Sequence, residues 1–370
     1  MDICKSKKRQ NMEEIIRQFS LANSVGAPCP LKIGFINDSF ILPAEQPGGT
    51  SYFLQRINHH IFENVEGLQQ NILTVTGHIR QKLAAEGETD LDRKVLRLIP
   101  TRDGKWFYRT PEGDCWRVYL LIEDAVSSDS ITPESAELAG EAFGRFQCQL
   151  SDLPFSELCE TIPHFHDMEF RLKQFHEALS ADKAGRASTA DSPGIIREIT
   201  RREEEMCLAE RLFREGKLPK RINHCDTKVN NLLFDREGRP LCIVDLDTVM
   251  PGYVLSDFGD FMRTAANTGA EDDPDLERIG VNMDIFAAYS RGYLREARFL
   301  TPTEKELLPF GCRLLSYMQA VRFFTDHLNG DTYYKIRYPE HNLVRTRAQL
   351  RLLEKQEEAR EAMENVIRSC

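Results

Sequence analysis

The sequence predicts an α+β protein of two lobes, the first built on an antiparallel sheet and the second mainly helical. Three features of the 370-residue chain predict this arrangement. Strand-like apolar runs separated by turn residues fill most of the first third. A hairpin pattern interrupts the later middle of the chain. Apolar residues at helical spacing dominate the last third. We therefore expect one lobe over residues 1–122 and another over residues 123–370.

The composition is that of an ordinary globular protein with no nucleic-acid or membrane partner. Hydrophobic residues make up 41% and charged residues 29%, and the net charge of -10 disfavours a general nucleic-acid surface. No run approaches about 18 apolar residues, so we expect no membrane span. The charged first ten residues lack the apolar stretch of a signal peptide. Ten scattered cysteines without a C-x-x-C pair indicate free thiols. We expect a cytoplasmic monomer or homodimer.

Five strand-like runs predict the first sheet, after a short leading helix within residues 11–27. Pro-Gly-Gly at 47–49 is one of the turns that separate the runs. A helix is expected between the second and third runs, where five apolar residues share one face: Leu68, Ile72, Val75, Ile79 and Leu83. The strand-like runs cover residues 32–42, 52–58, 95–99, 105–109 and 116–122.

The most informative stretch of the chain is the hairpin pattern. It opens with His-x-Asp-(x)4-Asn, carried by His224, Asp226 and Asn231. An apolar segment, a polar Gly-containing turn and a second apolar strand follow, and that strand ends at Asp245, with Asp247 two residues on. A hairpin brings the segment before its first strand close to the end of its second. We therefore expect Asp226, Asn231 and Asp245 to converge.

Phosphoryl transfer requires such a convergence. One carboxylate accepts the proton of the attacking hydroxyl, while an amide oxygen and a second carboxylate hold Mg²⁺ against the triphosphate. Asp226 fits the base, Asn231 and Asp245 fit the metal ligands, and His224 orients the loop. We expect Ser256 or Asp257 to cap the helix that follows, and Asp257 to tie that helix to this loop by hydrogen bonding. The alternative is a surface hairpin with incidental acids, because Asp and Asn are common turn residues.

The motif resembles that of the aminoglycoside-phosphotransferase and choline-kinase group, and within it the N-acetylhexosamine 1-kinases. The resemblance implies a bilobal protein-kinase-like fold and ATP with Mg²⁺ as phosphoryl donor. It implies transfer to the anomeric C1 hydroxyl of N-acetylglucosamine or N-acetylgalactosamine, giving a sugar 1-phosphate and ADP. It gives Asp226 the role of base and Asn231 and Asp245 the role of metal ligands. Cys225 departs from the small residue usual after the histidine.

The resemblance also implies that a loop of the first lobe covers the nucleotide. The loop contains Gly34, Asn37, Asp38 and Ser39, and its backbone N–H groups would face the phosphates. With a single glycine, it equally fits a bulge in an edge strand.

Two further nucleotide contacts are expected nearby. Kinases carry a lysine for the α/β-phosphates on the strand at 52–58, but this chain has Gln55 followed by Arg56. Alternation points these two to opposite faces, so Arg56 replaces the lysine only if the register slips by one. Ile122 and Glu123 are candidates for the hinge that meets the adenine, or an ordinary exit from a strand.

The sugar contacts expected from the resemblance are His166, Arg322 and Tyr333. His166 and Arg322 each also have a structural explanation. His166 precedes Asp167, which also fits a helix N-cap. Arg322 lies one turn from Asp326, which is a sufficient ion-pair partner.

Three other functions fit parts of the same pattern. A kinase of this fold could act on another small hydroxyl substrate, such as choline, an amino alcohol or an antibiotic. A non-catalytic nucleotide-binding protein would explain Gln55. A phosphatase of the haloacid-dehalogenase type uses an Asp-x-Asp strand like that of Asp245 and Asp247, but near its start and followed by βα units.

Overall fold

The computed structural model describes residues 12–31, 36–127 and 130–370, which form two compact units. The first unit runs to Val126 and includes two later segments, Glu157–Ile162 and Leu233–Asp247. The second unit consists of Ser127–Ser156, Pro163–Leu232 and Thr248–Cys370. The chain first crosses between the units close to the boundary expected after residue 122. The central hairpin, which the sequence places in the second lobe, belongs to the first unit from Leu233 on.

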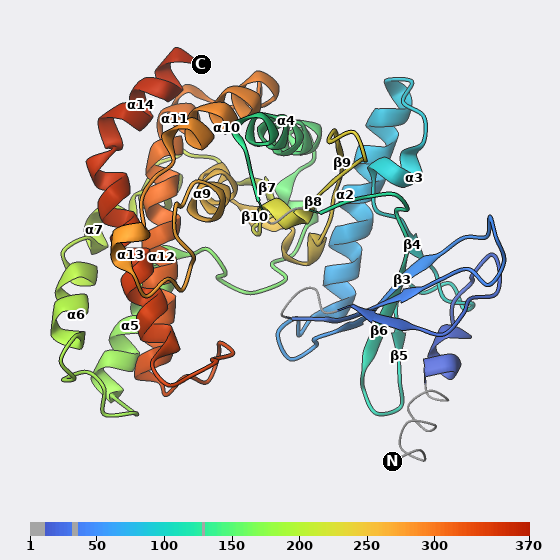
Figure 1. The fold of residues 1–370 in the computed structure, drawn as a ribbon, viewed down its shortest axis with the longest axis horizontal. Helices are drawn as coiled ribbons and strands as arrows, with labels where there is room; N and C mark the ends of the chain where they lie inside the picture. The colour runs from blue at the N-terminus through green and yellow to red at the C-terminus, as the bar shows by residue number, and fades with distance from the viewer. Residues whose placement is uncertain (1–11, 32–35, 128–129) are drawn as a thin grey trace. The chain divides into compact units, whose positions relative to one another are not determined.

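The first unit is built on a six-stranded antiparallel sheet (Figure 1). Its order is β1-β2-β3-β6-β4, and β5 pairs with β6. We expected five strands; the additional one is β1, which precedes the first predicted run. The bounds are β1 (Cys29–Leu31), β2 (Asp38–Leu42), β3 (Tyr52–Ile57), β4 (Leu98–Ile99), β5 (Tyr108–Arg109) and β6 (Cys115–Leu120).

The two faces of this sheet differ in chemistry. One face packs into an apolar core that contains Leu54 and Val118, together with Phe19 from the leading segment, which is helical over 12–16. Because successive side chains of a strand point to opposite faces, Gln55 of β3 and Arg117 of β6 lie on the other face. The sheet register places these two residues directly opposite each other.

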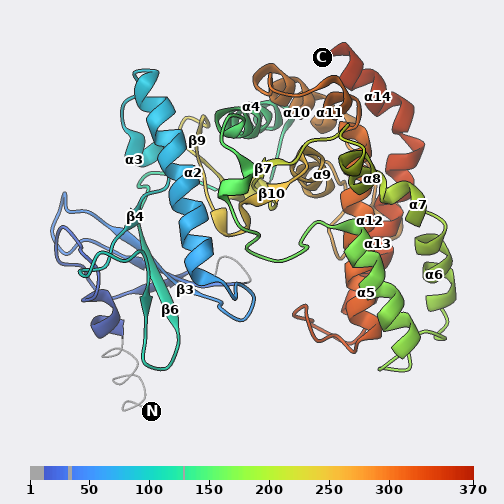
Figure 2. The same cartoon turned by 180° about the vertical axis from the view of Figure 1, so that it is seen from behind.

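Two helices and a hairpin complete the first unit. Helix α2 (Val65–Ala85) buries the expected apolar stripe, and Figures 1 and 2 both show it beside the sheet. Helix α3 (Leu91–Lys94) contacts β9 of the hairpin. The hairpin itself pairs β8 (Leu232–Phe234) with β9 (Pro240–Ile243), which confirms the strand–turn–strand pattern predicted from the sequence.

The second unit is mainly helical, as predicted. Thr132 caps helix α4 through a capping box with Ser135. Three short helices, α6 to α8, precede the strand that leads to the motif. The helices are α4 (Pro133–Leu150), α5 (Met168–Ala181), α6 (Ser192–Thr200), α7 (Glu203–Met206), α8 (Leu208–Arg214), α9 (Val254–Ala265), α10 (Met283–Glu296), α11 (Pro302–Glu306), α12 (Leu308–Leu328), α13 (His341–Glu358) and α14 (Arg360–Ser369).

Close helix packing fixes α9, the helix after the hairpin. Helix α12 contacts α9, α13 and α5, and these helices lie side by side in the second unit. At the α9–α12 crossing a Cβ added to Gly259 would lie 2.2 Å from the carbonyl oxygen of Gly311. Only glycine allows the two backbones to approach this closely. The position of α9 is therefore set by backbone contact.

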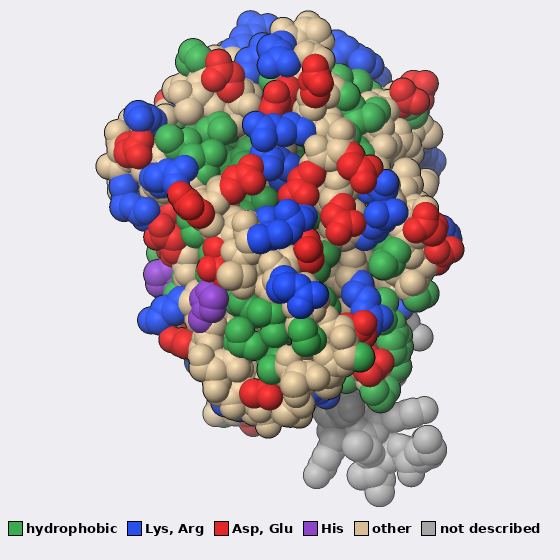
Figure 3. Space-filling view, turned by 90° about the vertical axis from the view of Figure 1, so that its left-hand side faces the viewer, with side chains coloured by type: hydrophobic (Ala, Val, Ile, Leu, Met, Phe, Trp, Pro, Cys, Tyr) green, Lys and Arg blue, Asp and Glu red, His purple; other side chains and the backbone are tan. Residues whose placement is uncertain are grey.

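Two features of the described residues are the hydropathy of the helices and the distribution of charge on the surface. None of the helices in the described part of the chain is long and apolar enough to cross a membrane. On the face drawn in Figure 3, acidic and basic side chains are interspersed.

Candidate active site

The loop that carries the His-x-Asp-(x)4-Asn motif follows β7 (Arg221–Asn223), which pairs with β10 (Met250–Gly252). His224 is fully buried between the ring edges of Phe143 and Phe146, each with its centroid 6.1 Å away. Its Nδ1 accepts a hydrogen bond from the backbone N–H of Asp226 at 3.3 Å. The ring holds the loop through packing and through this bond, and the orienting role of His224 stays a prediction.

Asp257 holds the same loop from helix α9, as expected. Its carboxylate accepts the backbone N–H groups of His224 and Cys225, both at 2.8 Å. Its backbone carbonyl accepts the hydroxyl of Thr227 at 2.6 Å. The expectation that it caps the helix is wrong, because α9 begins at Val254 and Asp257 lies in its first turn. Burial raises the pKa of Asp257 to about 6.

The residue after the histidine has a left-handed backbone. Cys225 has a φ of +63° and is buried. Glycine adopts this conformation without a steric cost, whereas other residues pay about 1 kcal/mol or more. The small residue usual at this position in the resembling kinases suits the backbone, and the bonds from Asp257 hold Cys225 in the same conformation.

Asp226 and Asn231 meet, as predicted. The Asn231 amide nitrogen donates to the Asp226 backbone oxygen at 2.8 Å and to its carboxylate at 3.3 Å. The Asn231 amide oxygen is thereby directed away from Asp226. The other carboxylate oxygen of Asp226 lies 2.8 Å from the Lys228 ammonium. Burial acts to raise the pKa of Asp226, but Lys228 outweighs it and the pKa is below its usual value.

Lys228 is a site residue that the sequence reasoning missed. It occupies one of the four unspecified positions of the motif, and the Asp226 carboxylate raises its pKa. A basic residue two positions after the proposed base was the available signal.

Asp245 and Asp247 follow β9 in the first unit. Asp245 is exposed and has a φ of +59°, a conformation that Asp tolerates better than most residues and that recurs at functional sites. Asp247 is buried, and its carboxylate lies 2.6 Å from the guanidinium of Arg117. The two acids therefore have different environments, since Asp245 is exposed and Asp247 is buried. Oxygen donors such as Asn231 and Asp245 are of the type that Mg²⁺ prefers.

The described part of the predicted nucleotide loop is joined to the sheet and to Asp247. Gly34 lies outside the described residues. The Asn37 amide donates to Asp247 at 2.7 Å. Ser39 accepts from the Gln55 amide at 3.1 Å. These bonds connect the loop to the segment that contains Asp245.

Arg56, the other candidate on β3, is engaged elsewhere. It forms an ion pair with Asp38 and lies 3.5 Å from Asp114, and 43% of its side chain is exposed. The predicted hinge residues Ile122 and Glu123 lie two and three residues after the end of β6 at Leu120. Ile122 is buried, and the Glu123 carbonyl accepts from Arg93 at 3.2 Å.

On the second unit, His166 and Asp167 have different roles. Asp167 caps α5 by accepting the N–H of Phe170 at 2.9 Å, so the capping alternative holds for Asp167. The His166 ring stacks on Phe165 with the centroids 4.4 Å apart. Burial, and then the charge of Arg322, lowers the pKa of His166 to about 3, so its imidazole is neutral.

Arg322 packs against aromatic rings. Its guanidinium carbon lies 4.9 Å from the ring centre of Phe165 and 5.7 Å from that of Tyr334, and it donates to Gln319 at 2.7 Å. Asp326, the alternative partner, instead accepts the backbone N–H groups of residues 332–334. Tyr333 is 56% exposed and its ring contacts that of Tyr334.

Arg171 and Tyr334 complete this group, and the sequence reasoning assigned neither to the site. Burial and the charge of Arg322 lower the pKa of Arg171 to about 10. Arg171 donates to the carbonyl of Phe165 at 2.9 Å and 3.1 Å. In the described part of the chain neither Arg171 nor Arg322 forms an ion pair with a carboxylate, and the Tyr334 hydroxyl and His166 Nδ1 are buried without a hydrogen-bond partner. We call Arg171, Arg322, His166 and Tyr334 the arginine cluster.

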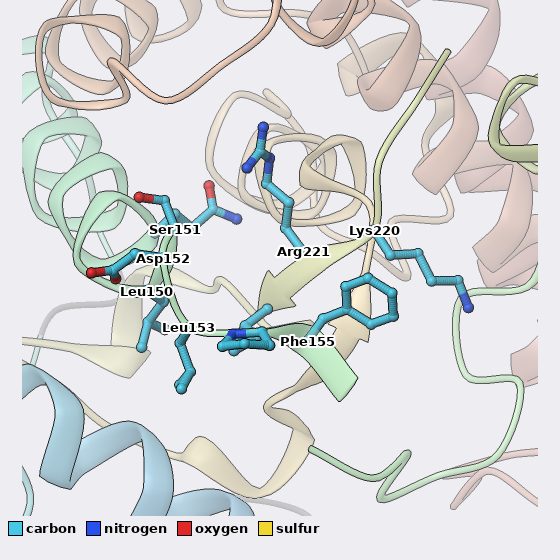
Figure 4. A pocket seen from close by; sticks show the side chains of 10 residues that line it. Leu150, Ser151, Asp152, Leu153, Phe155, Lys220 and Arg221 are labelled. Carbon is cyan, nitrogen blue, oxygen red and sulfur yellow. The ribbon is translucent and has the colours of Figure 1, made fainter. Parts of the chain in front are cut away.

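A hollow of about 180 Å³ lies elsewhere on the second unit, between the end of α4 and β7 (Figure 4). Its two cations already have partners. Arg221 forms an ion pair with Glu304, and the Lys220 ammonium lies 5.4 Å from the ring centre of Phe213. None of the residues of the motif lines the hollow, so it is not the site of the motif.

Solved structures with the same fold are small-molecule kinases. A microcompartment-associated aminopropanol kinase matches with a TM-score of 0.60 and 14% identity, over 96% of this chain and 98% of its own. An amicoumacin kinase in complex with AMP-PNP, Ca²⁺ and Ami matches with a TM-score of 0.61 and 14% identity, over 95% of this chain and 96% of its own. An ethanolamine kinase of Plasmodium vivax matches with 0.55 and 13%, over 88% and 82%. These matches confirm the protein-kinase-like fold.

The sequence itself identifies the family. The model of the APH phosphotransferase enzyme family matches residues 29–300, which contain the nucleotide loop, the motif and both acids of the hairpin. This match covers well over half of the chain. The chain therefore belongs to the APH phosphotransferase enzyme family.

Proposed function

We propose that this protein is an ATP-dependent kinase that phosphorylates the anomeric C1 hydroxyl of an N-acetylhexosamine, giving a sugar 1-phosphate and ADP. In this proposal Asp226 is the base, Asn231 and Asp245 hold Mg²⁺, and the loop of Asn37 to Ser39 faces the nucleotide. The sugar meets the arginine cluster and Tyr333.

The arginine cluster is the observation that carries the substrate proposal. Two guanidinium groups without a carboxylate partner create a positive environment, which repels an ammonium group and suits oxygen acceptors. His166 is neutral and adds no charge to the cluster. A neutral N-acetylated sugar offers hydroxyl and carbonyl oxygens to these donors, and the ring of Tyr334 offers a face for a pyranose. Aminopropanol and ethanolamine, named for two structural relatives, carry the opposite feature, a cationic amine.

Electrostatics connect the cluster to the proposed base. The charge of Asp226 acts on the pKa of His166, in the direction opposite to that of Arg322 and Arg171. An acceptor bound at the cluster would therefore lie within reach of the field of Asp226. Positioning a hydroxyl beside the base is a large part of what such an enzyme supplies.

The proposed chemistry uses the ionised form of Asp226. Because its pKa is below the usual value, Asp226 is a carboxylate at neutral pH and accepts the proton of the C1 hydroxyl. The hydroxyl oxygen then forms the bond to the γ-phosphorus as the bond to ADP breaks. Lys228 keeps the carboxylate ionised and fixes one of its oxygens. Mg²⁺, when bound with ATP, would neutralise the phosphate charge.

A matched pair of acceptors tests the substrate. N-acetylglucosamine and glucosamine differ at C2, where an amide replaces an ammonium group. With ATP and Mg²⁺ we expect turnover of N-acetylglucosamine or N-acetylgalactosamine, a much lower kcat/KM for glucosamine, and none for choline or ethanolamine. Phosphorus NMR of the product then locates the phosphate at C1. If the enzyme phosphorylates amino alcohols and ignores N-acetylhexosamines, the substrate proposal fails and membership of the kinase family stands.

A further inference from the structure

Arg117 is a buried cation in the middle of the first unit's sheet. It lies on β6 between the core residues Trp116 and Val118, and only 1% of its side chain is exposed. A charge in such a place is costly unless it is paired and hydrogen-bonded. Its partners therefore indicate why the sheet retains it.

Arg117 is bound to the residue that stands where kinases carry a lysine. Its Nε and Nη2 donate to the Gln55 side-chain oxygen at 3.1 Å and 2.7 Å. Gln55 is its direct cross-strand neighbour on β3. The Gln55 amide nitrogen in turn donates to Ser39 of the nucleotide loop at 3.1 Å. Gln55 thus links the guanidinium of Arg117 to that loop.

The same Nη2 atom also contacts the segment of the proposed metal ligand. Nη2 of Arg117 lies 2.6 Å from Asp247, which is two residues after Asp245. The other oxygen of Asp247 accepts from Asn37, whose own oxygen accepts the backbone N–H of Asn58 at 2.9 Å. Arg117 therefore joins β3, the nucleotide loop and the end of the hairpin.

One donor of Arg117 is unused. Its Nη1 is buried and has no hydrogen-bond partner among the described residues. An unsatisfied buried donor is costly. A bound oxygen acceptor on this face of the sheet would remove that cost.

We propose that Arg117 supplies, from β6, the positive charge that a lysine on β3 gives to the nucleotide phosphates in other kinases. Gln55 then holds the guanidinium in place. The inference rests on the proposed role of the first unit in binding Mg²⁺ and ATP. Arg56 does not compete for this role: it alternates to the opposite face from Gln55, is partly exposed, and Asp38 and Asp114 neutralise it.

Nucleotide binding without an acceptor tests this role independently of the sugar. Calorimetry with Mg²⁺ and the non-hydrolysable analogue AMP-PNP would compare Arg117→Met with Arg56→Met, a matched loss of charge on the neighbouring strand. We expect Arg117→Met to weaken binding by about 10- to 100-fold, as for other residues that support a metal–ligand site. Arg56→Met should leave the affinity unchanged.

Relocating the charge separates binding from packing. Gln55→Lys, added to Arg117→Met, restores a cation at the usual position on β3 and should recover most of the lost affinity. Unchanged affinity in a folded Arg117→Met protein would overturn the proposal. So would a failure of Gln55→Lys to recover any binding, because Arg117 would then act only by packing against Asp247.

A double variant provides the test if Arg117→Met alone does not fold. Arg117→Met with Asp247→Leu removes both buried charges, so no carboxylate is left unpaired in the sheet. Thermal unfolding shows whether it is folded. We expect weak AMP-PNP binding here and recovery by Gln55→Lys; normal binding, or no recovery, would overturn the proposal. A lack of turnover with N-acetylhexosamines would instead count against the sugar and leave these binding results unaffected.

Discussion

At the scale of single residues, the motif holds its base in place from three sides. His224 accepts the backbone N–H of Asp226, Asn231 donates to its carboxylate, and Lys228 forms an ion pair with it. Each of these groups comes from the same short loop, so their arrangement follows from local spacing. This is why the sequence could predict that Asp226 and Asn231 meet.

Replacing Asp226 by Asn is the most direct test of the base. The amide keeps the shape of the side chain but cannot accept the proton of the hydroxyl. We expect kcat to fall by about 10²- to 10⁴-fold, the usual effect of losing a general base. The affinity for Mg²⁺ and AMP-PNP should stay close to that of the wild type. A variant that retains most of its turnover would remove Asp226 from the mechanism.

The arginine cluster gives a prediction about the acceptor. Arg322→Ala removes two ring contacts and the main donor of the cluster, and should raise the KM for the sugar while the KM for ATP stays unchanged. Tyr334→Phe removes the buried hydroxyl that has no partner among the described residues, and should act in the same direction. Tyr333→Phe, at the exposed neighbour, tests the contact first inferred from the sequence.

Comparison of the two tyrosines distinguishes the possible sugar contacts. If only Tyr333→Phe raises the KM for the sugar, the exposed ring of Tyr333 contacts the sugar and the arginine cluster does not. If Arg322→Ala and both tyrosine variants show normal sugar kinetics, the acceptor binds elsewhere.

At the scale of elements, the site depends on a helix fixed by backbone contact. Helix α9 supplies Asp257, which holds the backbone N–H groups of His224 and Cys225. The close approach of Gly259 to Gly311 on α12 sets where Asp257 lies. A substitution at this crossing should therefore affect the motif by moving Asp257 on α9, although neither glycine contacts the motif.

Gly259→Ala tests this connection. Alanine normally stabilises a helix relative to glycine by about 1 kcal/mol. Here its Cβ would lie 2.2 Å from a backbone oxygen, so we expect a loss of about 1–3 kcal/mol in the free energy of unfolding, the usual cost of overpacking, and reduced kcat. The control is Gly77→Ala on α2, where nothing lies within 4 Å of the added Cβ. Equal free energies of unfolding for the two variants would show that α9 and α12 move apart without a loss of stability.

At the scale of the whole molecule, the sequence predicts what is local and misses what is assembled from distant elements. The apolar stripe of α2, the hairpin and the motif each lie within a short stretch of sequence. Their residue patterns were therefore sufficient to predict them. The arginine cluster joins α5 to α12, and the contact of Arg117 with Gln55 depends on which strands pair. Neither partnership can be read from spacing along the chain. A charged residue at a buried strand position was the only local sign of Arg117.

Stability should also depend on a buried carboxylate outside the site. Glu210 of α8 accepts the first backbone N–H of α5, that of Met168, at 2.8 Å, and burial raises the pKa of Glu210 to about 7. The folded protein therefore binds a proton here between pH 4.5 and 7 that the unfolded chain releases. The stability that Glu210 contributes is present below pH 4.5 and is lost as the pH rises through 7, a change on the order of 3 kcal/mol.

Glu210→Gln should remove this dependence, because glutamine keeps the acceptor for Met168 and cannot ionise. The free energy of unfolding of the variant should rise relative to that of the wild type between pH 4.5 and 8, measured by urea denaturation at each pH. Glu306→Gln, at an exposed glutamate of the same unit, is the control and should follow the wild type. If the wild type and Glu210→Gln keep a constant difference across this range, Glu210 does not hold a proton in the folded state. Its contact with Met168 would then be that of an ordinary ionised carboxylate at the start of a helix, where negative charge is favourable.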